Sequence, residues 1–552
     1  MRVAPGRRTS ARRVVPAGEV ARDEGLRGER TVMNADVVIV GAGPTGLMLA
    51  AELRLAGVRA LVLERRQQLR EIPRANGFGG QIAELLRYRG LLDRVVAAGT
   101  GAVQRAPRLP FGEVHLDFSR LADPPMWALG LPQPRLERVL GEHAAVLGAE
   151  VRRGHEVVAV SQDDAAAAAD VRGPDGIYRV SARYLVGCDG ARSRVRDLAG
   201  IAFPGTTYPE VHRLGQGTLA GDVTVLGNGD IDVPGLGTVR RGFTRTSRGV
   251  FAFGVTAGRV MIQTTEDETT AVDDDAPMSL AEFQGSIRRV LGAELPLAEV
   301  TRLSRYGFEA RQAERYRDGR ILVAGDAAHQ FPATGIGINT GMMDAVNLAW
   351  KLAAGVHGWA PPGLLGTYHD ERHFAGARGM LQTQAQVALR RGQDPAADAL
   401  RHLFLELMAY EQPLRHVGEL IAGSDFRYPL PNPGSHPLAG AFAPDLLLRT
   451  EDGSATSVAE LMRAARPVFL DLAGRTDLLE AARTWEGRVD IRTAMTVDRP
   501  ADALLIRPDA YIAWAATAGE PADSGVPALR EALSRWFGAP LDTAVPVAGR
   551  LS

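Results

Sequence analysis

The chain has 552 residues, a formal net charge of −1 and 45% hydrophobic residues. At roughly 150 residues per domain this length predicts three or four structural units, and the balanced charge gives no reason to expect nucleic acid or an anionic membrane as a partner. The one cysteine, Cys188, excludes an intrachain disulfide and a thiolate metal cluster. No apolar run reaches the roughly 18 residues that a membrane-spanning helix needs. These properties fit a globular protein of the cytoplasm.

Residues 1–32 differ from the rest of the chain, because they are basic, rich in Arg, Gly and Pro, and without apolar periodicity. A signal peptide requires an apolar segment after its charges, and none follows here. We expect a disordered extension, or an upstream start ahead of Met33, that takes no part in the fold.

Folded structure is predicted to begin at Asp36 with a βαβ unit. The β-branched run Val37–Val40 predicts a buried strand, Gly46–Ala56 a helix and Ala60–Leu63 a second strand of a parallel sheet. The alanine-rich run 165–169 is interpreted as a loop. Later elements of this unit are expected as a helix at 136–147 and strands at 150–153, 156–160 and 184–186.

Between residues 203 and 303 short alternating stretches are broken by Gly and Thr, which predicts a mostly antiparallel sheet inserted into the first unit. The parallel pattern returns with Ile321–Ala324, and a long helix is expected at Gly341–Ala354. Helical sequence continues to about Ile421, and the Pro- and Gly-rich segment 428–437 is a predicted linker. The last residues predict a smaller α/β unit, with strands at 467–472, 489–493 and 503–506 and a helix at 527–537.

A glycine-rich turn, Gly41-Ala42-Gly43-Pro44-Thr45-Gly46, joins the first strand to the first helix. Gly41 permits a tight turn, Gly43 lets backbone approach a pyrophosphate, and Gly46 allows close packing of helix on strand. The helix N-terminus supplies N–H donors for phosphate, and Glu64 ends the second strand, where a carboxylate accepts ribose hydroxyls. The motif predicts a dinucleotide site, but its spacing does not separate FAD from NAD.

Two further turns follow predicted strands, Gly325-Asp326 and Cys188-Asp189-Gly190. Gly325-Asp326 resembles the Gly-Asp motif of the class A flavoprotein monooxygenases, the para-hydroxybenzoate hydroxylase group, in which the Asp binds the ribityl chain of FAD. The second turn resembles the same group's Asp-Gly motif, which is associated with FAD and NAD(P)H. A helix cap is the alternative for Asp326, and Cys188 is interpreted as a small core residue.

The resemblance extends over nearly the whole chain from Met33. It is strongest to hydroxylases of aromatic polyketide pathways, of the angucycline and anthracycline type, and to rifampicin monooxygenases. The supporting stretches are 131–133, 152–157, 344–352, 368–373, 505–509 and 536–538.

The resemblance implies an α/β fold with three parts. An FAD-binding Rossmann-like domain of the glutathione-reductase type is expected at 33–202 and 304–427, and a substrate-binding β-sheet domain at 203–303. A thioredoxin-like domain is expected at 434–552. Because this last part contains no cysteine, dithiol chemistry is excluded there and we expect a structural role.

The resemblance also implies which residues meet the ligands. Gln81, Pro332 and Ile336 are expected to line the substrate site, although relatives usually carry an arginine in place of Gln81 and a glutamine in place of Ile336. We therefore expect a more apolar site that favours less oxygenated rings. No catalytic side chain is assigned, and no metal site is expected. The predicted FAD contacts are Gly41, Gly43, Pro44, Thr45, Gly46, Glu64, Arg65, Arg74, Gln133, Val157, Asp189, Gly190, Gly325, Asp326, Pro332, Gly337, Ile338 and Asn339.

The implied activity is that of a monooxygenase. It uses FAD, NAD(P)H and O2 to hydroxylate an aromatic, polyketide-like small molecule through a flavin C4a-hydroperoxide, in secondary-metabolite biosynthesis. The substrate is expected between the inserted sheet and the FAD domain, on an apolar floor. Alternatives are Baeyer–Villiger oxygenation and a non-catalytic flavin-binding protein. The assembly that we consider for this chain is a homodimer.

Overall fold

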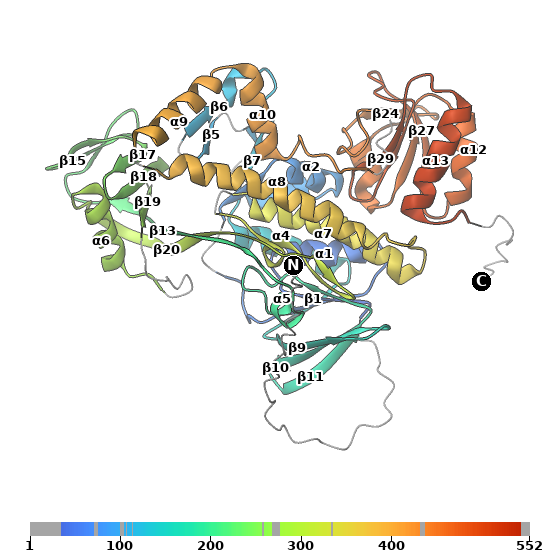
Figure 1. Ribbon diagram of the computed structural model, residues 1–552, viewed down its shortest axis with the longest axis horizontal. Coiled ribbons are helices and arrows are strands. Elements are labelled where there is room, and N and C mark those ends of the chain that lie inside the picture. The colour runs from blue at the N-terminus through green and yellow to red at the C-terminus, as the bar shows by residue number, and fades with distance from the viewer. Residues whose placement is uncertain are drawn as a thin grey trace, which may run out of the picture.

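The computed structural model describes residues 35–70, 75–99, 104–105, 108–112, 114–256, 259–267, 277–332, 335–392, 394–430 and 436–541. A central α/β unit carries an antiparallel sheet at one end and a second α/β unit at the other (Figure 1). The expected N-terminal extension, residues 1–32, and the predicted flavin contact Arg74 lie outside the described residues.

The central sheet has the strand order β21-β22-β12-β1-β2-β8 and is parallel except for the pair β21–β22. β1 lies between β12 and β2, with Val37 opposite both Tyr184 and Ala60. Every residue of β1 is buried, as expected for an uninterrupted β-branched run in a parallel sheet. The strands are β1 (Val37–Val40), β2 (Ala60–Glu64), β8 (Glu150–Arg153), β12 (Tyr184–Gly187), β21 (Arg317–Asp318) and β22 (Ile321–Val323).

Different layers cover the two faces of this sheet. Val37 and Ile39 pack with helices on one face, whereas Val38 and Val40 pack against a second, three-stranded sheet on the other. Alternation along β1 therefore contributes to two cores. The helices are α1 (Pro44–Leu55), α4 (Gln133–Val146) and α7 (Gly337–His357), and the small sheet contains β9 (Glu156–Gln162), β10 (Ala167–Gly173) and β11 (Gly176–Ala182).

The interpretation of residues 165–169 as a loop is wrong for residues 167–169, which belong to β10. Ala167 and Ala169 lie in β10, opposite Ala182 and Val180, and both are buried. Alanine is depleted in strands, so composition gave no strand signal. Its small side chain nevertheless suits a layer that packs closely on the central sheet.

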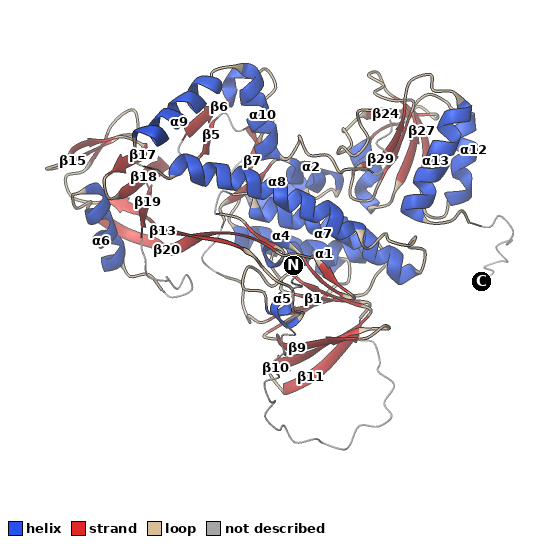
Figure 2. Ribbon diagram, viewed as in Figure 1, coloured by secondary structure: helices blue, strands red, loops and turns tan. Residues whose placement is uncertain are grey.

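The inserted sheet has the order β17-β18-β19-β13-β20-β23. Its two long strands, β13 (Gly205–Leu219) and β20 (Leu297–Gln312), run out from the central unit (Figure 2), and the expected domain boundary at residue 303 falls within β20. Helix α6 (Leu280–Leu291) covers one face, where a Cβ on Gly215 would lie 2.2 Å from the Phe283 ring. The other strands are β17 (Gly242–Thr246), β18 (Gly249–Thr256), β19 (Arg259–Asp267) and β23 (His329–Gln330).

The face of this sheet opposite α6 is mixed rather than apolar, which corrects the expected apolar floor. His212 is buried there against the rings of Tyr306 and Phe308. Its Nδ1 lies 2.9 Å from Thr265 Oγ1 and 3.3 Å from Gln263 Nε2. The alternation that puts Gly215 against α6 puts His212 on this opposite face.

The C-terminal unit is a mixed six-stranded sheet with the order β25-β24-β27-β26-β28-β29. Trp350 of α7 packs into its core beside Trp536, so the core crosses from one unit to the other. Helices α8 (Thr367–Arg390), α9 (Pro395–Leu407) and α10 (Glu411–Ala422) connect the units. The C-terminal elements are β24 (Leu447–Thr450), β25 (Ala455–Ser457), α11 (Val458–Leu461), β26 (Val468–Asp471), α12 (Thr476–Ala482), β27 (Asp490–Met495), β28 (Ala503–Ile506), β29 (Ile512–Ala516) and α13 (Ala522–Phe537).

A buried ionic cluster joins α7, α8 and the C-terminal unit. Arg507 donates to Glu371 and Asp509 through its guanidinium nitrogens. Lys351 Nζ lies 2.7 Å from Glu371 Oε2, and Asn347 Nδ2 donates to both carboxylates. Burial opposes ionisation of Glu371, but Arg507 and Lys351 lower its pKa. The cluster therefore holds ionised, mutually paired groups.

We predict that Arg507→Leu destabilises the protein by about 3–5 kcal/mol, because it leaves Glu371 and Asp509 buried without their cation. Denaturant unfolding of the protein measures this effect. The matched control is Arg172→Leu, which removes an exposed pair with Glu156 and is expected to change little. Equal shifts of the two variants would contradict the prediction.

Candidate active site

The glycine-rich turn after β1 has an open backbone on one side. Gly41 has a φ of +105°, and a Cβ there would lie 2.4 Å from Cys188 O, whereas a Cβ at Gly46 would lie 2.0 Å from Gly41 O. A Cβ at Gly43 would meet nothing within 4 Å. Helix α1 begins at Pro44 without a capping side chain, so its first N–H groups remain available to an anion.

Glu64 lies beside this turn at the end of β2. Its Oε2 accepts a hydrogen bond of 2.8 Å from Ala42 N, and its Oε1 accepts one of 2.9 Å from Arg66 N. These backbone donors fix the carboxylate, and each oxygen keeps a second lone pair for a hydroxyl group. Arg65, the next predicted contact, is exposed.

The Gly325-Asp326 turn packs directly on α1. Gly325 has a φ of +64°, and a Cβ there would lie 2.6 Å from Thr45 Oγ1. Asp326 is exposed, and its Oδ1 lies 3.4 Å from the position of a Cβ on Gly337. The fold thus brings the predicted contacts Thr45, Asp326 and Gly337 together, although they are far apart in the sequence.

Asp189 binds the first N–H groups of the short helix α5 (Arg194–Leu198), whose N-cap residue is Ser193. It accepts hydrogen bonds from Ser193 Oγ at 2.5 Å, Arg194 N at 2.8 Å and Val195 N at 3.1 Å. Burial raises the pKa of this carboxyl group despite these bonds. Gly190 follows with a φ of +88° and open space where a Cβ would lie.

The remaining predicted contacts lie in several elements. Gln133 begins α4; its N–H donates to Ala75 O at 3.0 Å, and its Nε2 donates to Glu137 Oε1 at 2.7 Å. Val157 is buried in β9, so a ligand would meet its backbone rather than its side chain. Pro332 is buried just after β23.

A buried triad holds the Gly-Asp turn to α8. Asp344 Oδ2 accepts hydrogen bonds from Gly325 N at 2.9 Å and pairs with His329 Nε2 at 2.6 Å, while Arg372 Nε donates to Oδ1 at 2.7 Å. Burial opposes ionisation, but His329 and Arg372 lower the pKa of Asp344. Arg372 also donates to Thr340 O at 3.1 Å. One helix therefore fixes both the turn and the start of α7.

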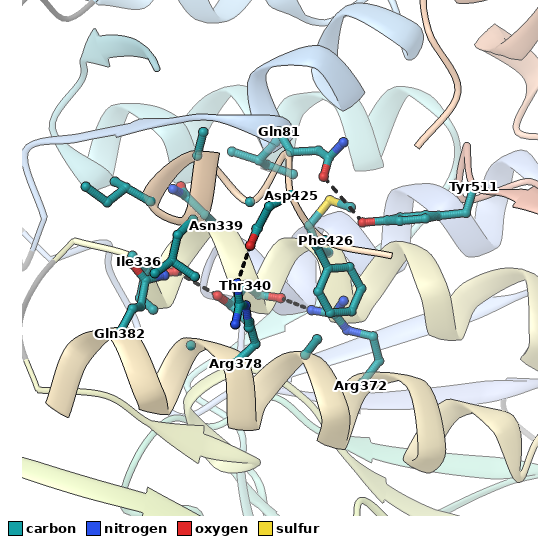
Figure 3. A pocket seen from close by; sticks show the side chains of 18 residues that line it. Gln81, Ile336, Asn339, Thr340, Arg372, Arg378, Gln382, Asp425, Phe426 and Tyr511 are labelled. Atoms are coloured by element: carbon teal, nitrogen blue, oxygen red, sulfur yellow. Dashed lines mark hydrogen bonds and ion pairs between the residues drawn. The ribbon is translucent and has the colours of Figure 1, made fainter. Parts of the chain in front are cut away.

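A cavity of about 590 Å³, including its part open to solvent, lies beside the start of α7 (Figure 3). It brings together Gln81, Ile336 and Asn339, which the sequence predicted, and Gln81 Oε1 lies 3.5 Å from Tyr511 Oη of the C-terminal unit. Sequence reasoning missed its other polar side chains. These are Thr340, Arg372, Arg378, Gln382 and Asp425.

The spacing of the missed residues on α8 could have identified them in the sequence. Arg372, Ala375, Gly379 and Gln382 recur at helical spacing and share one face of the helix. Gly379 permits a close approach, because a Cβ there would lie 2.9 Å from the Phe331 ring and 3.2 Å from Ile336 Cδ1. Asp425 lies in an irregular segment after α10, where no periodic pattern could reveal it.

The residues at the start of α7 fit a flavin. Helix α7 has Ile336 at its N-cap and no capping side chain, so its first N–H groups are free to meet carbonyl oxygens. Asn339 Nδ2 donates to Gly79 O at 2.9 Å, but within the described ranges no donor reaches its buried Oδ1. Together with Glu64 and the open turn at Gly43, these groups are donors and acceptors of the kind that FAD can bind.

No described helix is long and apolar enough to cross a membrane. The described residues also contain no cluster of three or more His, Cys, Asp or Glu side chains that could hold a metal ion. His329, the histidine closest to the Gly-Asp turn, is a buried hydrogen-bond partner of Asp344.

The fold and these turns define a dinucleotide-binding α/β protein with a flavin-type site. A family profile described as FAD binding domain matches residues 34–383, and one described as aromatic-ring hydroxylase, C-terminal, matches residues 436–540. The chain belongs to the FAD-dependent aromatic-ring hydroxylases. It is an FAD-dependent monooxygenase, and NAD(P)H is the typical co-substrate of such enzymes.

Three relatives illustrate the similarity. The 12-dehydrotetracycline 5-monooxygenase/anhydrotetracycline 6-monooxygenase of Streptomyces rimosus is 41% identical over 521 residues, covering 92% of this chain and 100% of that protein. Rifampicin monooxygenase of Streptomyces venezuelae is 38% identical over 511 residues, covering 91% and 99%. The crystal structure of CabE, an aromatic hydroxylase from angucycline biosynthesis, matches with a TM-score of 0.81 at 37% identity, covering 92% and 99%.

We predict that Asp326→Ala weakens FAD retention by about 1.5–3 kcal/mol, or roughly 10- to 100-fold, because a carboxylate–hydroxyl hydrogen bond is lost. Dialysis against dilute FAD measures the remaining flavin. Asp222→Ala, which changes an exposed aspartate in a turn of the inserted sheet, serves as the control. Equal occupancy of both variants would count against the assignment.

Proposed function

We propose that the protein hydroxylates a polycyclic aromatic substrate of the polyketide type, in the biosynthesis of a secondary metabolite. The cavity beside the start of α7 carries this proposal, because it adjoins the group of residues that fits a flavin and is bounded by both α/β units. None of its lining residues comes from the described part of the inserted sheet, so this cavity does not lie where the sequence placed the substrate, between that sheet and the FAD domain. The activities for which two relatives are named, which concern tetracycline and rifampicin compounds, support the substrate class.

The finer architecture is part of the same proposal. A glutathione-reductase-type FAD domain at 33–202 and 304–427 would carry the substrate sheet, expected at 203–303 although its strand β20 continues to Gln312, with a thioredoxin-like domain at 434–552. The mixed sheet of the C-terminal unit, with β26 parallel to β27 and antiparallel to β28, supports the last assignment. A homodimer and a cytoplasmic location stay predictions.

When bound, FAD supplies the redox chemistry, taking electrons from NAD(P)H and activating O2. The residues of the chain position it: the turn at Gly43 receives the pyrophosphate, Glu64 the ribose and Asp326 the ribityl chain. The aliphatic side chain of Ile336 and the ring of Phe426 help to shield the cavity from water, which limits wasteful side reactions.

The function is tested with the purified protein and a panel of polycyclic phenols. Heating is expected to release intact FAD, and substrate is expected to stimulate NADPH oxidation and to give a product one oxygen atom heavier with its rings unchanged. Ring expansion at the same mass would indicate Baeyer–Villiger oxygenation instead. Bound FAD without stimulated turnover by any phenol would favour a flavin-binding protein.

Ile336→Gln is predicted to shift preference toward hydroxyl-rich substrates. Ile336 is buried and can only pack, whereas a buried amide without a partner costs about 1–3 kcal/mol and gains from a polar ligand group. The measurement compares kcat/KM for sparsely and richly hydroxylated polycycles. A ratio that stays within about twofold, or ~0.5 kcal/mol, would show that the substitution is neutral.

A further inference from the structure

The wall of the cavity formed by α8 and the segment after α10 presents two unpaired acceptor atoms. Gln382 is 5% exposed, and among the described residues no donor reaches its Oε1. Asp425 pairs with Arg378 through one oxygen, while its buried Oδ1 has no donor within the same residues. Both side chains line the cavity, and Figure 3 shows them near Ile336 and Asn339.

Two buried acceptors without donors are costly when they share one cavity. Buried polar atoms in folded proteins are nearly always paired, and an exception needs an explanation such as a ligand. The predicted FAD contacts lie on other elements of the fold, and none is on α8 or in the segment after α10. The donors that meet Gln382 and Asp425 are therefore expected from the substrate.

The charges around the cavity favour a neutral donor over an ammonium group. Arg378 balances the carboxylate of Asp425, and Arg372 is paired with the buried Asp344. The lining therefore holds no unbalanced negative charge that would select a cation. Hydroxyl and amide N–H groups are the neutral donors that remain.

We propose that Gln382 is a specificity-determining residue, whose Oε1 accepts a hydrogen bond from a hydroxyl group on the substrate edge that faces α8, with Asp425 Oδ1 accepting from a neighbouring hydroxyl or amide group. This inference rests on the proposed function. It also refines the expectation of a more apolar site. Ile336 forms an apolar wall of the cavity, whereas Gln382, about one helical turn beyond Gly379, forms a polar wall.

Gln382→Leu tests the proposal in the FAD-loaded full chain. The probes are a hydroxylated polycyclic phenol that the parent protein oxygenates and its analogues in which one peripheral hydroxyl is replaced by hydrogen. We expect about a tenfold loss in kcat/KM for the parent phenol, equal to ~1.4 kcal/mol, and no loss for the analogue without the contacted hydroxyl. Gln382→Glu keeps the acceptor and is expected to retain the discrimination.

The matched control is Gln384→Leu, the same change at an exposed position on the same helix, and it is expected to leave all substrates unaffected. FAD occupancy and substrate-free NADPH oxidation should equal those of the parent in every variant. If Gln382→Leu weakens every analogue equally, or none, the role of Gln382 is overturned while the proposed function stands. If the parent oxygenates no phenol of the panel, both fall.

Discussion

Helix α8 carries buried charges that pair with charged groups in two other parts of the protein. Neighbouring residues of this helix serve two clusters: Arg372 binds Asp344, which holds the Gly325 turn, and Glu371 binds Arg507 of the C-terminal unit. A charge removed from water is tolerated only with a partner in good geometry. The clusters therefore allow one relative placement of the cofactor turn, α8 and the C-terminal unit.

This arrangement gives the C-terminal unit a structural role, although the unit contains no cysteine. Arg507 is enclosed by the aromatic rings of Trp350, Tyr428 and Trp536, which hold its guanidinium plane in place. Arg89 of the central unit binds Glu52 and donates to Pro508 O, so a second buried arginine secures the same contact. Tyr511 then reaches the cavity wall from a unit that is fixed in position.

The sequence predicted local elements well and long-range pairings poorly. Val37–Val40 and Ala503–Ile506 were placed to the residue, because a continuous apolar run marks a buried strand. Helix α7 begins at Gly337, before the predicted Gly341, since glycine and asparagine weaken the helical signal there. The motif residues Glu371 and Arg507 were recognised without a role, because nothing in either segment reveals a partner so distant in the chain. Gln382 was missed although it recurs at helical spacing with the other cavity residues of α8, and Asp425 was missed because it lies in an irregular segment.

The first and later turns of α8 have different roles, and this difference affects how the substrate preference of such an enzyme can change. Its first turns carry charged side chains that pair with two other parts of the protein, so substitutions there destabilise the fold. Its later turns, around Gly379 and Gln382, touch the cavity without supporting those clusters. Substitutions in the second half of this helix can therefore change which ligands the cavity prefers. A mutational library confined to that half would vary the cavity lining and leave the buried ion pairs intact.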